Sequence, residues 1–398
     1  MKRFFILFIA FSFFQQSHSQ DLKDIKDDFM AAESHMFYGS YSSAIPIYEE
    51  IISKGFDNAN INFSLGFCYL NLEGQEDKAI PYLKKACLDM TRDYREGSYK
   101  ETKAPIEAKF YLGNAYRINE QLDLAIQAYK EYRDLLNVDE IYFIEYVDLQ
   151  IACCNNAREE MQFPIKIKKT NLGDDINDEN HNYAPALPAD NSFMIFTTKS
   201  LEYDSYYDEE YFLNKIYYAD RKNGSWSKPR NIDTQLETDY YCTSLSVSSG
   251  GDTLYLFMDD IGDGNIYMSY KEGNRWTGIK KCRKICSRDN ETHASVSPDG
   301  NTIYFTSNMS DGKGGLDIYM AKRKDNGKWD KPVNLGENIN TPFDEETPYI
   351  CQDGKTLYFS SEGHNSIGGF DIFYSKMDEN GEWSVPLNIG YPLNTTND

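Results

Sequence analysis

The sequence predicts an α-helical region followed by a β-sheet region, each built from repeats. From about Asp21 to Met161, apolar residues recur three and four positions apart with few turn residues between them, which is the spacing of amphipathic helices. Toward Asp398, apolar and polar residues alternate on both sides of turn dipeptides, which indicates β-hairpins. Four tryptophans recur in this second region at intervals of about 50 residues, a period typical of propeller blades. The predicted fold class is therefore multidomain, α then β: an α-solenoid of helical hairpins followed by a β-propeller.

The helical region repeats one order of small and large residues. Two copies show it best: Leu65, Gly66, Tyr69, Ala79, Leu83 and Ala86, and Leu112, Gly113, Tyr116, Ala125, Tyr129 and Tyr132. Small residues at such positions let two antiparallel helices approach closely while large ones fill the space between them. The pattern resembles the tetratricopeptide repeat over residues 25–57, 59–91 and 106–139. We expect a polar inserted loop at Asp93–Lys103 and a capping helix at Ile141–Met161.

Stacks of this kind present a concave groove, and the resemblance implies which positions face it. The groove positions are Asn62, Phe63, Tyr69, Lys109, Asn114 and Tyr116. Tyr69 and Tyr116 also fall on the apolar sites of the repeat, so a packing role is the alternative for these two.

The clearest β unit is Glu291–Asn340. It predicts strands at Thr302–Ser307, Asp317–Ala321 and Pro332–Leu335. A Gly-Gly-x-Asp sequence precedes the second strand, and its glycines fit a corner at which a Cβ would be strained. The aspartate of this sequence is expected to cap the corner through backbone hydrogen bonds. The next unit repeats these features with Asp353-Gly354, Gly368, Gly369 and Asp371.

Four such units follow one another, and each has one tryptophan. The tryptophans are Trp226, Trp276, Trp329 and Trp383, and the turns fall at Asp190-Asn191, Gly250-Gly251, Asp299-Gly300 and Asp353-Gly354. The units resemble the WD40-like PD propeller repeat, named for its Ser-Pro-Asp-Gly turn at residues 297–300. The first two units depart from it because they lack the Gly-Gly-x-Asp sequence. The segment Asn171–Asn177 also matches 334–340 and 388–394. The ring could therefore close with four or five blades using the strand near Asn171, or the chain could be part of a longer protein.

Composition and the N-terminus predict an exported, acidic protein. The net charge is −22 and no basic block occurs, which argues against nucleic acid as a partner. Met1–Ser19 has the positive start, the apolar core at Phe4–Phe14 and the small-x-small end of a signal peptide. No later segment is apolar and long enough to span a membrane, and no Cys follows the predicted cut. The predicted domains are a signal peptide (1–19), a helical-repeat domain (20–161) and a propeller (162–398).

The sequence motifs favour a protein without catalysis, cofactor or metal. No Gly-x-Ser-x-Gly sequence occurs, and no two histidines share a metal-ligand spacing. We expect His181 and His293 to lie in surface loops, although both begin blade segments and could line the funnel. Asp259–Asn265 is expected to be a turn, because it lacks the alternation and the closing Glu of a calcium loop. Eight cysteines permit disulfides in an exported chain, and a Cys282–Cys286 bridge is left open.

The insertion Leu201–Leu213 lengthens the first blade with tyrosines among acidic residues. Exposed tyrosines are typical of recognition surfaces, which makes Tyr203, Tyr206, Tyr207 and Tyr211 candidate partner-binding residues. The alternative is a hairpin with aromatic edges that packs on the helical domain.

The combination of helical repeats and PD propeller resembles exported multidomain envelope proteins of the Bacteroidetes type. Some of these proteins serve type IX secretion and gliding, and many carry a peptidoglycan-binding domain that this sequence lacks. The resemblance implies a periplasmic scaffold, associated with the outer membrane through protein partners. The alternative function is a binding module for a glycan or cell-wall fragment, with tyrosine and tryptophan stacking on sugars.

Overall fold

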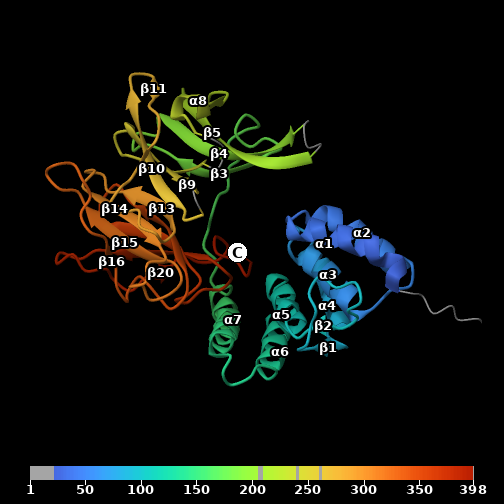
Figure 1. Cartoon of the computed structure of the whole chain (residues 1–398). Coiled ribbons are helices and arrows are strands. Elements are labelled where there is room, and N and C mark those ends of the chain that lie inside the picture. Colours follow the sequence, from blue (N-terminus) through green and yellow to red (C-terminus); the bar gives the residue numbers. More distant parts are fainter. Residues whose placement is uncertain (1–21, 205–208, 239–241, 260–261, 398) are drawn as a thin grey trace, which may run out of the picture. The chain divides into compact units, whose positions relative to one another are not determined.

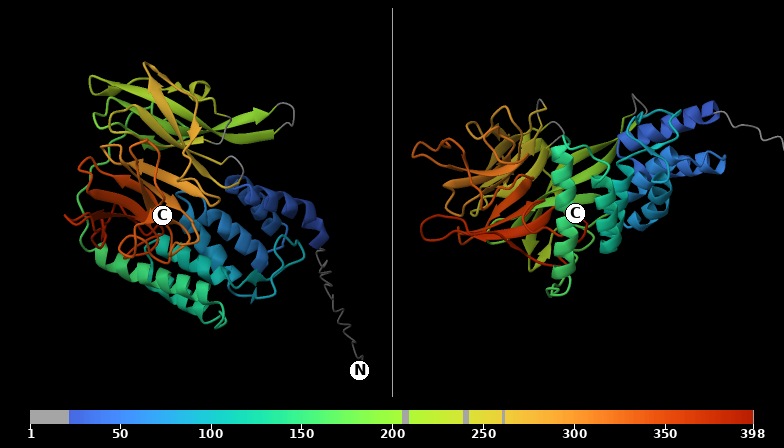
Figure 2. Two further views of the ribbon diagram at one scale, coloured as in Figure 1. Left: turned by 60° about the vertical axis from the view of Figure 1, so that its left-hand side comes forward. Right: turned by 90° about the horizontal axis from the view of Figure 1, so that it is seen from below.

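The computed structural model describes residues 22–204, 209–238, 242–259 and 262–397, and the predicted signal peptide lies outside them. Contacts between residues divide the chain into two compact units, Met1–Val147 and Asp148–Asp398. The first contains helices and the second contains the large sheets (Figures 1 and 2). The predicted order of a helical region followed by propeller-type sheets is therefore confirmed.

The helical unit consists of hairpins in which consecutive helices pack against one another. A short 3-10 turn (Leu22–Ile25) leads into the first helix, and a second one (Glu76–Lys78) precedes α4. The helices are α1 (Lys26–Phe37), α2 (Tyr41–Ser53), α3 (Ala59–Leu70), α4 (Ala79–Ala86), α5 (Ala108–Ile118), α6 (Leu122–Arg133) and α7 (Ile141–Glu160). Helices α1 and α2, α3 and α4, and α5 and α6 form the three hairpins that the repeats predict.

Two glycines explain why the repeat needs a small residue in the first helix of the hairpin. A Cβ built on Gly66 would lie 2.7 Å from Leu83 Cγ, and one built on Gly113 would lie 2.5 Å from Tyr129 Cε1. Both partners are fully buried in the second helix of the same hairpin. The large residues of the sequence pattern therefore occupy the space that the glycines leave, as predicted.

The predicted inserted loop is closed at its base by two short parallel strands. Strand β1 (Met90–Thr91) pairs with β2 (Ala104–Pro105). The buried side chain of Asn60 on α3 holds the loop, because its Nδ2 donates to the Glu101 carbonyl at 3.3 Å and its Oδ1 accepts from Tyr94 Oη at 2.6 Å. Asn60 N donates to the Thr102 carbonyl as well. The loop is thus an anchored part of the helical unit.

Helix α7 spans the division between the two units. Its second half belongs to the unit of the sheets, where Asn156 Nδ2 donates to the Ser366 carbonyl at 2.9 Å. The residues that follow also contact the sheets, since Ile165 N donates to the Tyr391 carbonyl at 2.7 Å. The compact units therefore divide at Val147, inside α7, whereas the sequence places the domain boundary after it.

In its described residues the second unit contains four antiparallel sheets, whose strands lie in chain order except that β7 pairs with β5 and β12 pairs with β10. The first sheet has β3 (His181–Ala186), β4 (Phe193–Asp204), β5 (Glu209–Lys222), β6 (Ser225–Trp226) and β7 (Arg230–Asn231), followed by the short helix α8 (Asp233–Leu236). The second has β8 (Cys242–Val247), β9 (Thr253–Met258), β10 (Asn265–Glu272), β11 (Arg275–Trp276) and β12 (Lys280–Lys281). The third has β13 (Glu291–Val296), β14 (Thr302–Ser307), β15 (Asp317–Lys322) and β16 (Val333–Asn334). The fourth has β17 (Glu345–Ile350), β18 (Thr356–Ser361), β19 (Asp371–Lys376) and β20 (Leu387–Asn388).

Neighbouring sheets pack face to face around the innermost strands, as propeller blades do. Strand β3 contacts β8, β8 contacts β13, and β13 contacts β17. Each of the three interfaces between sheets has its own apolar core. We call the side of a sheet that is turned to the following sheet its forward face and the opposite side its back face. A tryptophan of the following sheet enters each core, as Trp383 does where it meets Tyr304 at 6.0 Å between ring centroids.

A segment after the last long strand of each sheet covers part of the forward face, and we call these segments straps. The straps are residues 232–236, 282–286, 334–340 and 388–394, and 171–177 is a fifth segment of the same kind that precedes the first sheet. The first three contribute Leu236, Ile285 and Ile339 to the cores between sheets. The segment 171–177 contributes Ile176 to a core on the back face of the first sheet.

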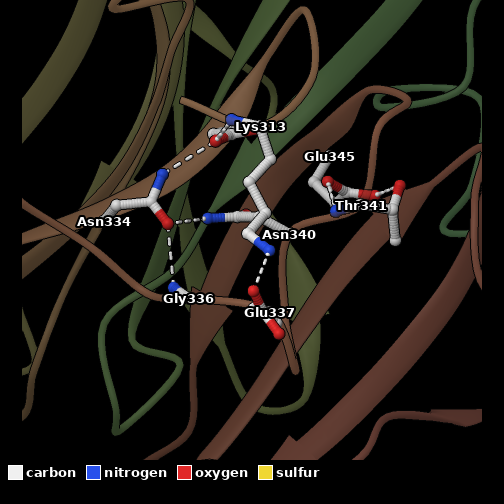
Figure 3. A network of polar contacts seen from close by, with 8 residues as sticks. Lys313, Asn334, Gly336, Glu337, Asn340, Thr341 and Glu345 are labelled. Carbon is white, nitrogen blue, oxygen red and sulfur yellow. Dashed lines mark hydrogen bonds and ion pairs between the residues drawn. The ribbon is translucent and has the colours of Figure 1, made fainter. Parts of the chain in front are cut away.

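Asparagines fix the last two straps to the third strand of their sheets. Asn340 Oδ1 accepts from Ile318 N at 2.8 Å, and Asn340 Nδ2 donates to Ile318 O at 2.9 Å. The same Nδ2 donates to Asn334 Oδ1 at 2.9 Å (Figure 3). In the fourth sheet Asn394 makes the same pair of bonds to Ile372. The repeated asparagines of the sequence thus have a structural role.

The Gly-Gly-x-Asp corners form as predicted, but the reason for their glycines differs from the expected one. Asp317 accepts from Lys313 N at 2.6 Å and from Gly314 N at 3.1 Å, which confirms the predicted cap. Neither Gly314 nor Gly315 has a positive φ. Instead, a Cβ on Gly314 would lie 2.3 Å from the Phe343 carbonyl oxygen. The glycines are needed because the chain entering the next sheet passes over them, and not because of backbone strain.

Three further expectations concern cysteines, metals and membranes. Cys282 and Cys286 form no disulfide, and the Cys286 thiol instead donates to the Ile266 carbonyl at 3.4 Å, at the place where Asn340 bonds in the third sheet. Asp259 accepts from Gly262 N at 2.6 Å, although part of the predicted turn lies outside the described residues. In the described ranges, no helix combines the length and the apolar character that crossing a membrane requires.

Candidate functional site

Half-buried aromatic rings form a continuous surface on the helical unit. Phe63 and Phe67 lie one turn apart on α3, and both contact Tyr111 on α5, at centroid distances of 5.8 and 5.1 Å. Tyr41 of α2 lies 6.1 Å from Phe67, and Tyr94 of the anchored loop lies 6.2 Å from Phe63. We call these five residues the aromatic face. Each ring is packed edge-on or tilted against its neighbours, so the surface is ordered and keeps apolar area accessible.

Carboxylates surround the aromatic face. Burial raises the pKa of the Tyr111 hydroxyl, and Glu107 and Glu96 raise it further. The pKa of Tyr94 is raised for the same reasons, with Glu33, Glu96 and Glu101 as the charges that contribute. Phenols whose pKa is raised stay protonated, so the aromatic face carries neutral hydroxyl groups inside a negative field. Such a surface suits a partner that brings apolar side chains together with Lys or Arg.

The structure places the predicted groove residues in different surroundings. Phe63 belongs to the aromatic face, whereas Asn62 is buried in the first turn of α3, where its Nδ2 donates to Asp57 Oδ1 at 2.6 Å. Tyr69 is buried, stacks on Tyr82 at 5.6 Å and donates from its hydroxyl to Glu49 at 2.7 Å. Tyr69 therefore packs internally, which is the alternative role expected from its apolar position in the repeat.

The other predicted groove residues lie between α4, α5 and α6. Tyr116 is buried and lines a cavity of about 240 Å³, which Lys109 and Leu112 also line. Asn114 is half-buried, and its Oδ1 accepts from Tyr129 Oη at 2.8 Å. Lys109 forms an ion pair with Glu131 at 2.6 Å. The predicted set is therefore divided, and partner binding by Asn62, Tyr69, Asn114 and Tyr116 stays a prediction.

Of the aromatic face, only Phe63 is predicted from the sequence. Phe67 could have been found, because its spacing of four residues from Phe63 places both on one side of a helix. Tyr94 and Tyr41 had no such signal. Tyr94 reaches the surface from the inserted loop, and Tyr41 comes from a different helix, so only the fold brings them together.

A second candidate site is the cavity on the propeller axis. It has a volume of about 350 Å³ and is lined by the innermost strand of every sheet. Tyr183 and Tyr349 line it with 37% and 52% of their surface exposed, and His293, Leu245 and Pro348 line it as well. Burial lowers the pKa of His293 to about 4, so its imidazole is neutral at pH 7. The cavity therefore has no formal charge among its described lining residues.

Bulges in the innermost strands shape this cavity. Each of the four strands shifts register near its middle, and Ala184 and Thr347 have φ of +51° there. Ser244 Oγ holds the first bulge by donating to the Ala184 carbonyl at 2.7 Å. The expectation that His181 and His293 lie in surface loops is wrong, because both belong to innermost strands, β3 and β13. Two-residue alternation breaks at a bulge, which is why the sequence pattern did not show these strands clearly.

The tyrosine-rich insertion forms a long hairpin of β4 and β5 that extends beyond the other strands of the first sheet (Figures 1 and 2). Tyr203 is 59% exposed on β4, and Leu201 and Phe212 are exposed near it. Tyr211 belongs to β5, where it pairs with Glu202, and Tyr206 and Tyr207 lie outside the described residues. An ion pair between Lys215 and Glu202 supports the hairpin.

Nothing in the described part of the chain gathers three or more His, Cys, Asp or Glu side chains in a way that could hold a metal ion. His364, which could have been a ligand, is half-buried against Phe359 and Phe373 and bonds to the Ile339 carbonyl at 3.0 Å. Aromatic surface and an uncharged cavity support binding.

The protein thus has a helical N-terminal region followed by propeller-type sheets, with one candidate binding surface on each unit. Neither a protein-family model nor a protein of curated function matches the chain. Solved structures that resemble it include TolB from Acinetobacter baumannii, with 16% identity and a TM-score of 0.35 over 52% of this chain and 43% of that one. A putative TolB from Agrobacterium tumefaciens has 14% identity and a TM-score of 0.33, over 53% and 83% of the two chains.

A puromycin-hydrolyzing peptidase of Mycobacterium tuberculosis is similar at 12% identity and a TM-score of 0.32, over 52% of this chain and 29% of that one. The chain thus spans less than half the length of the Acinetobacter protein and of the peptidase. Likeness at these TM-scores assigns neither an activity nor a partner.

Proposed function

We propose that this protein is a non-enzymatic scaffold of the cell envelope that binds protein partners through the aromatic face of its helical unit. The observation that carries the proposal is the cluster of Phe63, Phe67, Tyr111, Tyr41 and Tyr94, which stays half-exposed although each ring is held in place. Ordered aromatic side chains bind with little loss of conformational entropy, which is why they dominate protein interfaces.

The surrounding charge specifies the chemistry of the partner. Glu96, Glu101 and Glu107 lie near the rings, and the chain as a whole carries a net charge of −22. We therefore propose a partner segment with apolar and basic residues, which the acidic field attracts and the rings hold. The predicted export signal and the resemblance of the repeats support a partner in the periplasm or at the outer membrane, and the type IX secretion and gliding machinery is the proposed setting.

Substitution of one ring tests the proposal. The full mature chain is used as bait in an envelope extract of the native host, as wild type, as Phe67→Ala and as Phe37→Ala. Phe37 is the matched control because it is 83% exposed on α1 and makes its ring contact with Tyr38, outside the aromatic face. We expect stoichiometric envelope proteins on the wild type and the control, and at least a tenfold loss on Phe67→Ala. Equal retention by all three baits would contradict the proposal.

The axial cavity supports a second candidate function, the binding of a neutral glycan or cell-wall fragment. Sugars stack on aromatic rings, and Tyr183 and Tyr349 supply such rings in a cavity without formal charge. Tyr349→Ala should then abolish binding of cell-wall oligosaccharides in calorimetry. Tyr270→Ala is the control, since Tyr270 is also partly exposed, at 37%, and lies on β10 outside the lining of this cavity. Absence of binding by the wild type rejects this candidate and leaves the first unaffected.

A further inference from the structure

The forward face of the fourth sheet exposes residues whose counterparts are buried in the other three sheets. On the second strand, Tyr358 is 36% exposed, whereas Ile195, Tyr255 and Tyr304 are at most 3% exposed. On the third strand, Ile372 is 40% exposed, whereas Ile216, Ile266 and Ile318 are fully buried. In the straps, Leu393 is 45% exposed, whereas Leu236, Ile285 and Ile339 are fully buried. The fourth sheet therefore carries the apolar residues of an interface between sheets, and no sheet formed by the described residues covers them.

The structure also shows what covers such a face. The forward face of the third sheet packs against Leu357, Phe359 and Trp383 of the fourth sheet. That of the second packs against Ile303, Phe305 and Trp329 of the third, and that of the first against Leu254, Leu256 and Trp276 of the second. In all three cases the cover is a branched aliphatic residue, a second large apolar residue on the same strand and a tryptophan. These three residue types define the chemistry that a binding partner of the exposed face must present.

The number of straps argues against the first sheet as that occupant. Each interface between sheets contains one strap, which belongs to the preceding sheet. The back face of the first sheet already holds the segment 171–177, whose Ile176 is buried against Met194 and Phe196. The fourth sheet brings its own strap, 388–394. An interface between the fourth and first sheets, within one chain or between two copies, would have to hold two straps in the space of one.

We propose that the forward face of the fourth sheet binds one further β-sheet of the same repeat type, presented by a partner polypeptide. The partner sheet places a branched aliphatic residue, a second large apolar residue and a tryptophan over Tyr358, Ile372 and Leu393. In the three observed interfaces, the strap that follows a sheet packs between the forward face of that sheet and the back face of the next. The segment 171–177 packs in the same way on the back face of the first sheet. The forward face of the partner sheet is therefore complementary to this segment. The contact surface is thus the continuation of three interfaces that the protein already forms.

The test presents such a sheet at high effective concentration by joining it to the chain. A copy of residues 291–340, the third repeat, is added after Asp398, and oxidative footprinting with mass spectrometry follows Tyr358 and Leu393. Their peptides remain unique, because the added copy duplicates a different sheet. We expect the modification rates of both residues to fall several-fold, with Tyr358 reaching the rate of the buried Tyr255, which lies outside the duplicated segment. A matched control carries Ile303→Asp and Phe305→Asp in the added copy only and should leave both rates unchanged.

Three outcomes would overturn the proposal. Unchanged rates with a folded extension would show that the face does not accept a sheet. An extension that stays unfolded, by hydrogen exchange, would count against it equally, because a complementary face should fold the added repeat. Finally, the unextended chain could protect Tyr358 and Leu393 as its concentration rises, with a dimer mass in sedimentation. A second copy would then be the occupant, in place of a partner sheet.

Discussion

Replacing Asp317 by Ala should lower the free energy of unfolding of the propeller by about 3–5 kcal/mol. Asp317 is 1% exposed, and its carboxylate accepts from Lys313 N at 2.6 Å, Gly314 N at 3.1 Å and Asn334 Nδ2 at 2.7 Å. Hydrogen bonds to a charged group contribute about 1.5–3 kcal/mol each, and donors left unpaired in the interior add a desolvation cost. The loss should also loosen the strap, because Asn334 connects the carboxylate to Asn340 (Figure 3).

Denaturant unfolding followed by tryptophan fluorescence measures this effect. All four tryptophans lie in the sheets, so the signal reports the propeller and not the helical unit. Asp325→Ala is the matched control, because Asp325 is exposed at a turn of the same sheet. Surface substitutions of this kind change stability by less than about 0.5 kcal/mol. If both variants unfold at the same denaturant concentration, the capping role of Asp317 is refuted.

Replacing Glu345 by Gln should remove a pH dependence of stability worth about 2–3 kcal/mol between pH 8 and pH 5. Glu345 is fully buried, and burial raises its pKa from 4.5 to about 7 despite hydrogen bonds from Thr341 and Ser361. Because the pKa is raised in the folded state, the folded protein holds the proton where the unfolded chain has lost it. The stabilisation is therefore complete below about pH 4.5 and is lost as the pH rises through about 7. One pKa unit corresponds to about 1.4 kcal/mol.

The measurement is the difference in unfolding free energy between wild type and Glu345→Gln at pH 8 and at pH 5. We expect the wild type to gain relative to the variant on acidification. Glu379→Gln, at an exposed turn of the same sheet, should follow the wild type at both pH values. A difference that stays constant with pH would mean that Glu345 does not take up a proton in the folded protein within this range.

The axial cavity shows where sequence patterns stop being informative. His293 and Thr347 sit at register shifts in β13 and β17, and a bulge interrupts the alternation that marks a strand in the sequence. The four bulged strands are also far apart in the chain, so no local pattern could show that they line one cavity. The aromatic face is likewise assembled only by the fold, because its rings come from helices of three different hairpins and from the inserted loop.

The sequence by itself determined the helical hairpins, the four sheets and the aspartate caps. Each of these depends on residues close in the chain: Gly113 and Tyr129 in one hairpin, and Asp317 beside the corner that it caps. Only the tertiary structure decided which repeated residues are covered. Ile318 and Ile372 occupy the same position in neighbouring repeats, yet one is fully buried and the other is 40% exposed. The physical reason is that the burial of a residue depends on whether another sheet packs against its face. The sequence of one repeat does not specify that neighbouring sheet.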